Sequence, residues 1–91
     1  MLAINVFNKL MQTVIEQMSI LKELNRLGGS EDIKRIVANI IRDSVDKLYL
    51  KSSKHPEFKS FYDNFVRIQN DDLKAVYNLL GAQENATNTD N

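Results

Sequence analysis

Several residue types that carry chemistry are missing or scarce in this chain of 91 residues. It has no cysteine, which excludes disulfides, thiolate nucleophiles and cysteine-ligated zinc or iron–sulfur centres. It has one histidine, His55, so no pair of imidazoles is available to ligate a metal ion. Lys plus Arg equals Asp plus Glu at twelve each, so no net charge draws the chain toward nucleic acid.

Helix breakers and long apolar runs are scarce as well. Three glycines and one proline leave room for long helices, and no apolar run reaches the roughly 20 residues that a membrane span needs. Asn5, Asn8 and Lys9 interrupt the apolar opening segment, which we interpret as a helix and not as a signal peptide. With a hydrophobic content of 43%, the sequence predicts a globular, cytoplasmic protein with a packed core.

The clearest pattern is an apolar seam between residues 4 and 27, with steps of three and four residues that are typical of one helix face. Its members are Ile4, Phe7, Met11, Val14, Met18 and Leu21. Further apolar residues widen this seam beyond what a helix with one buried side needs. Gly28-Gly29 is expected to end the helix, because glycine adopts the left-handed conformation without steric cost.

A second helix is predicted to begin after Ser30, whose hydroxyl suits an N-cap, with Glu31 and Asp32 in its first turn. Residues 51–56 form the next connection, and Pro56 suits the first position of a third helix. The expected inner face of the third helix is Phe58, Phe61, Tyr62, Phe65 and Ile68. A short fourth helix carries Leu73, Val76, Tyr77 and Leu80, and Gly81 is expected to stop it.

These elements predict an all-α fold, a small antiparallel bundle of four helices in which the third and fourth can alternatively merge into one bent helix. Residues 1–81 form the expected single domain. Residues 82–91 are polar and aperiodic, and we expect them to be a disordered tail.

The residues that could suggest catalysis or metal binding have simpler explanations. Ser30 lacks the strand and turn that hold a nucleophilic serine, so we interpret it as a cap. The acidic pairs Glu31-Asp32 and Asp71-Asp72 lack the spacing of a calcium loop and lie where helix starts favour acids. The sequence therefore predicts no enzyme, no cofactor, no metal site and no small-molecule substrate.

One stretch is locally basic. Lys47, Lys51, Lys54 and Lys59 surround His55, with only Glu57 opposing them. This stretch could contact phosphates or a membrane surface. The alternative is a solvated segment whose lysines complement the negative end of the second helix.

The excess of apolar residues on the first helix favours protein–protein interaction. The predicted contact set is Phe7, Leu10, Met11, Val14, Met18 and Leu21, in which the methionines give an adaptable surface. We therefore expect a non-catalytic interaction or regulatory module that binds a protein partner or forms a homodimer.

Two other functions stay open. Between Ile36 and Ile68, the positions of Ile40, Leu48, Pro56, Glu57, Phe61, Tyr62 and Phe65 resemble those of the small immunity proteins that protect producers of pediocin-like bacteriocins. This resemblance implies a cytosolic four-helix bundle that acts at a membrane receptor without catalysis. The third and fourth helices could also form a helix-turn-helix in a DNA-binding regulator, although the second of them offers Lys74 behind two acids.

Overall fold

The computed structural model describes the backbone of residues 2–88 and the side-chain surroundings of residues 4–81. In this part of the chain, four α-helices follow one another: α1 (Leu2–Leu27), α2 (Glu31–Lys54), α3 (Lys59–Ile68) and α4 (Asn70–Asn88). A short 3-10 turn, η1 (Pro56–Phe58), precedes α3. The predicted all-α bundle is confirmed.

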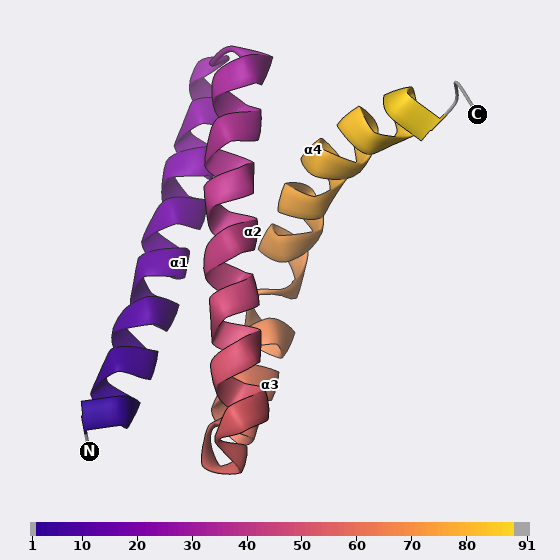
Figure 1. Cartoon of the computed structure of the whole chain (residues 1–91). Helices are drawn as coiled ribbons and strands as arrows, with labels where there is room; N and C mark the ends of the chain where they lie inside the picture. The colour runs from indigo at the N-terminus through magenta and orange to yellow at the C-terminus, as the bar shows by residue number, and fades with distance from the viewer. Residues whose placement is uncertain (1, 89–91) are drawn as a thin grey trace.

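Helices α1 and α2 form a long antiparallel hairpin, and α3 and α4 make a third limb that is bent where the two helices meet (Figure 1). The bend lies at Gln69, whose N–H donates to the carbonyl of Phe65 while its own carbonyl accepts from Leu73. The arrangement is thus nearer to the bent third helix that the sequence allowed than to four antiparallel helices. The molecule measures 44 × 34 × 19 Å, and its thinnest dimension equals about two helix diameters of roughly 10 Å.

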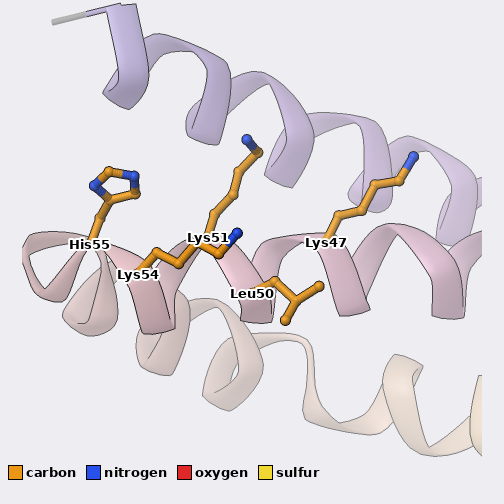
Figure 2. Close-up of a pocket in the computed structure, with 5 residues that line it drawn as sticks. All are labelled: Lys47, Leu50, Lys51, Lys54 and His55. Carbon is orange, nitrogen blue, oxygen red and sulfur yellow. The ribbon is translucent and has the colours of Figure 1, made fainter.

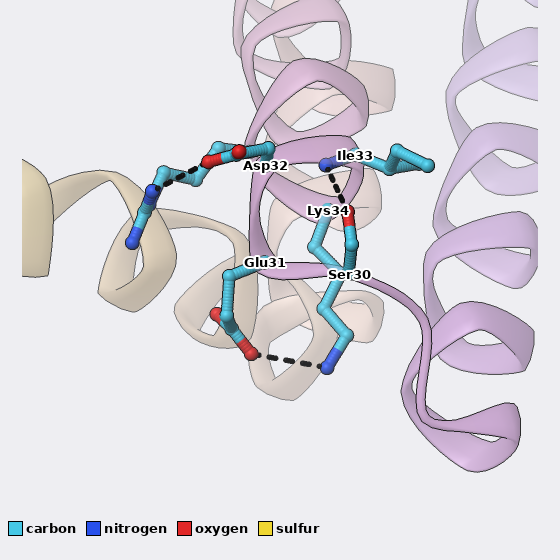
Figure 3. A network of polar contacts seen from close by, with 6 residues as sticks. Ser30, Glu31, Asp32, Ile33 and Lys34 are labelled. Atoms are coloured by element: carbon cyan, nitrogen blue, oxygen red, sulfur yellow. Dashed lines mark hydrogen bonds and ion pairs between the residues drawn. The ribbon is translucent and has the colours of Figure 1, made fainter.

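The turn between α1 and α2 follows the sequence prediction closely. Gly28 has a φ of +73°, in the left-handed region that glycine enters without strain, and Gly29 N–H donates to the Leu24 carbonyl at 2.8 Å. Ser30 then caps α2, because its hydroxyl accepts a hydrogen bond from the backbone N–H of Ile33 at 3.1 Å (Figure 3). Glu31 also pairs with Lys34 at 3.2 Å within the first turn.

The second connection is shorter than the predicted residues 51–56, because α2 continues to Lys54. Pro56 starts η1 and not α3, which begins three residues later at Lys59. The fixed φ and missing N–H of proline suit the first position of a 3-10 turn as well as that of an α-helix. His55 ends α2, and its N–H donates to the carbonyl of Lys51 at 3.0 Å.

The core lies where the hairpin meets the bent limb. Phe7 of α1 and Phe58 of η1 stack there with ring centroids 4.9 Å apart. Ile41, Leu48 and Val76 are among the other fully buried side chains. The remaining buried apolar side chains are Val14, Met18, Leu21, Ala38, Val45, Phe65, Leu73 and Leu80.

The predicted inner face of the third helix is only partly correct. Phe58 and Phe65 are buried and Tyr62 is half-buried, but Phe61 and Ile68 are exposed. Successive residues on a helix are about 100° apart, so Phe61 and Ile68 lie to one side of Phe65, where they border an open hollow between α1 and α3. The sequence pattern included them because their spacing also fits one broad stripe.

Gly81 does not end the last helix, which corrects the predicted helix boundary. Helix α4 continues through Gly81 to Asn88, and Gly81 does not adopt a positive φ. A glycine inside a helix costs about 1 kcal/mol relative to alanine, which disfavours the helix without stopping it. The side chains of residues 82–88 and all of residues 89–91 lie outside the described part of the chain. The disorder of the tail, residues 82–91, therefore stays a prediction.

Phe58→Ala should lower the free energy of unfolding by about 3–5 kcal/mol, because it removes a buried ring and leaves a cavity beside Phe7. Phe61→Ala removes the same number of atoms from an exposed site and should cost about 1 kcal/mol or less. Urea unfolding followed by circular dichroism compares the two. Equal losses would contradict the assignment of Phe58 to the core.

Candidate interaction surfaces

The contact set predicted on the first helix forms part of the protein's own core. Phe7, Val14, Met18 and Leu21 are buried, while Leu10 and Met11 are half-buried and pack against the core. That these six residues bind a partner stays a prediction. In the single chain, α1 packs against α2 and α4, and Phe7 stacks on Phe58 of η1, so most of the seam is already covered.

Large apolar side chains are exposed elsewhere, mainly on α2. Ile33, Ile36 and Ile40 expose 50%, 59% and 46% of their surface, and they share one helix face because they are three and four residues apart. Isoleucine is among the residues most often fully buried in proteins.

Apolar side chains occupy two different sides of α2. Ala38, Ile41, Val45 and Leu48 face the core. Ile33, Ile36 and Ile40 lie on a second side of the same helix, rotated from Ile41 by roughly 80–140° at about 100° per residue. The apolar residues of α2 are spaced so that they form two faces, and this spacing can be recognised in the sequence. Within residues 4–81, the first helix exposes three large apolar side chains, Val6, Ile20 and Leu27, whereas α2 exposes five, because Tyr49 and Leu50 add to its three isoleucines.

Three of the four lysines in the predicted basic stretch lie together. Lys47, Lys51 and Lys54 line a shallow hollow of about 450 Å³ with Leu50 and His55 (Figure 2). They come together because α2 repeats every 3.6 residues, so positions 47, 51 and 54 share one side. Lys59 lies outside this hollow, where its ammonium pairs with Asp63 at 3.1 Å.

A second hollow, of about 310 Å³, lies between α1 and α3. Met11, Ile15, Phe61, Phe65 and Ile68 contribute its apolar part. Its remaining lining residues are the carboxamides Asn8, Gln12, Asn64 and Gln69, so the lining carries no charge.

The three tyrosines approach one another at the junction of α2, α3 and α4. Tyr49 and Tyr62 meet edge to face with ring centroids 5.9 Å apart. Burial raises the pKa of Tyr62 and of Tyr77, and the charge of Asp46 adds to both shifts. The sequence analysis missed this cluster, because residues 49, 62 and 77 are too far apart in the chain for any local pattern to group them.

The remaining candidates hold structural positions. Among the described residues, no three His, Asp or Glu side chains lie together as a metal site would require. Asp72 pairs with Lys22 of α1 at 3.0 Å, and Leu73 and Val76 are buried, so the start of α4 packs on the hairpin. Lys74 is the one cation in the segment of α4 that was predicted to read DNA. In the described part of the chain, no helix is both long enough and apolar enough to cross a bilayer.

Comparison with models of known protein families, with curated proteins and with solved structures gives no match for this chain.

The raised pKa values of Tyr62 and Tyr77 predict a loss of stability in alkali. A tyrosine with a raised pKa in the folded state stabilises the fold fully below the unfolded value of about 10, and this contribution is lost as the pH rises through the folded value. The urea midpoint should fall above pH 10, and Tyr62→Phe with Tyr77→Phe should make that fall shallower. An unchanged slope in the double variant would contradict the assignment.

Proposed function

We propose that this protein is a non-catalytic interaction module, with a regulatory role, that buries the outer apolar face of α2 against another protein chain. The observation that carries the proposal is the exposure of Ile33, Ile36 and Ile40 on one face. A contiguous apolar patch of this kind is typical of a protein-binding surface, because water disfavours it in a lone molecule.

This proposal keeps the mode of action expected from the sequence and moves the contact surface from α1 to α2. Ile36 and Ile40 take over the role that the sequence analysis gave to Met11 and Met18. The move follows from burial, because only side chains that are accessible in one chain can contact a second.

Absence of catalysis and a cytoplasmic location belong to the same proposal. Ser30 caps α2 and is therefore engaged with the backbone, and the exposed His55 lies 3.7 Å from Glu57 at the end of the same connection. Neither side chain lies in a closed, apolar cavity of the kind that binds a small substrate. The lack of cysteine is compatible with a reducing compartment.

A photoreactive benzoylphenylalanine in place of Ile36 should crosslink the protein to a second chain in the cells that produce it. The same group in place of Lys74, which is exposed on α4, is the matched control and should give little product. Denaturing electrophoresis measures both. If position 36 gives no more product than position 74, the proposed function is wrong.

Contact with an anionic surface is a second candidate function, favoured by the lysine-lined hollow on α2. Lys47, Lys51 and Lys54 bring three positive charges together with Leu50, whose side chain is more than half exposed. Basic residues near an apolar side chain are typical of peripheral membrane contact, worth about 1 kcal/mol per lysine. The resemblance to bacteriocin immunity proteins implies a function at a membrane and is compatible with this candidate.

Sedimentation with lipid vesicles tests the second candidate. Vesicles with anionic lipid should retain the protein at low salt, and Lys51→Glu with Lys54→Glu should reduce binding by at least about tenfold. Lys59→Glu is the control, because Lys59 lies outside the hollow. Equal binding to purely zwitterionic vesicles, or an equal loss with Lys59→Glu, would contradict this function.

A further inference from the structure

The outer side of α2 carries a complete seven-residue repeat along its length. Counting in steps of three and four, the seam consists of Ile33, Ile36, Ile40, Asp43, Lys47, Leu50 and Lys54, and each of these side chains is exposed. This spacing is that of the contact positions in a coiled coil, which one helix presents to another. Figure 2 shows the second half of the seam, where Lys47, Leu50 and Lys54 follow one another along α2.

The described part of the chain holds nothing that covers this seam. The hairpin and the bent limb make two layers in a molecule 19 Å thick, and the limb packs on the opposite side of α2. The four apolar members of the seam, Ile33, Ile36, Ile40 and Leu50, can therefore be buried only against another molecule.

The two charges at the centre of the seam decide how a second copy would lie. In a parallel pair, Asp43 would face Asp43 of the other copy, and Lys47 would face Lys47. In an antiparallel pair centred at the level of Val45, Asp43 of each copy faces Lys47 of the other, so two unlike-charge pairs form. Close unlike charges favour association, and like charges that face each other oppose it.

We propose that a second copy of this chain covers the seam, with the two α2 helices antiparallel and Asp43 of each copy opposite Lys47 of the other. This proposal rests on the function proposed above and names its partner. Neighbouring layers match as well, because Ile40 then faces Leu50, and Ile36 faces the aliphatic stem of Lys54.

Other antiparallel registers match less well. A shift by seven residues places Ile40 opposite Asp43, which buries a carboxylate against an apolar side chain. A shift by fourteen residues pairs Ile36 with Ile40 but brings Asp43 beside Glu31 and Asp32 at the start of the other copy's α2. A shift by seven residues in the other direction leaves Ile33, Ile36 and Ile40 beyond Lys54, where the other copy's α2 ends. The register centred at Val45 leaves only Ile33 beyond that end and avoids the two other costs.

Both central charges are available for such pairing. The carboxylate of Asp43 has only an exposed contact with the guanidinium of its neighbour Arg42, at 3.6 Å. Lys47 forms no ion pair with any residue in the described part of the chain. Exposed pairs between neighbours contribute little, so Asp43 can exchange Arg42 for Lys47 of a second copy at small cost.

Sedimentation equilibrium of the whole protein at low salt tests the proposal by charge exchange. Wild type should form a dimer, and Asp43→Lys or Lys47→Asp alone should raise the dimer Kd by about tenfold, since each places like charges together twice. The double variant Asp43→Lys with Lys47→Asp should return the Kd to within about threefold of wild type.

Lys59 and Asp63 provide the matched control, because they are also an exposed Lys–Asp pair four residues apart, on α3. Lys59→Asp, Asp63→Lys and their combination should leave the dimer Kd unchanged, and circular dichroism should show every variant folded. If the single charge changes leave the dimer Kd unchanged, or if the double variant does not restore the Kd, the proposed register is wrong.

A monomeric wild type at all concentrations would overturn self-pairing. The crosslink at position 36 then tests the proposed function separately. A crosslink to a different protein supports the proposed function without self-pairing, and the absence of any crosslink contradicts both the function and the self-pairing. The two failures are thus distinguishable.

Discussion

The structure depends on the packing of one bent limb against one side of a helical hairpin. Phe58 and Phe65 enter between α1 and α2, and the stack of Phe58 on Phe7 joins the limb to the start of the chain. Because α3 and α4 cover only one side of the hairpin, the other side of α2 has no layer above it in the described chain. The core and the exposed apolar face therefore have a single origin: α2 is apolar on two sides, and the limb is long enough to cover one.

Function follows from that asymmetry. Hydrophobic burial stabilises a chain in proportion to the apolar surface it removes from water, and roughly half of the surface of Ile33, Ile36 and Ile40 stays in contact with water. Association would bury this surface at the cost of ordering two molecules, and that gain is the driving force of the proposed interaction. The charges at the middle of the seam add selectivity, because they favour one orientation over the other.

Local signals predicted much of the fold. Gly28 and Ser30 place the end of the first helix and the start of the second, because caps and turns depend on a few neighbouring residues. The sequence did not reveal which of two apolar faces would be covered. From the sequence alone, the apolar seam of α1 and the isoleucines of α2 are equal candidates for an exposed surface. Which of the two is covered depends on where the limb formed by α3 and α4 packs. The tyrosine cluster escaped prediction for the same reason, since its members meet only after packing.

Distances between spin labels decide whether α2 is covered by α2 of a second copy in the antiparallel sense. The chain has no cysteine, so one introduced cysteine carries one label per copy. At a rise of 1.5 Å per residue, the antiparallel pair should give less than about 20 Å between labels at Asp46, near the centre, and about 40 Å between labels at Asp32. Short distances at both positions would indicate a parallel pair, and no dipolar coupling at either would mean that the outer face of α2 has no second copy on it.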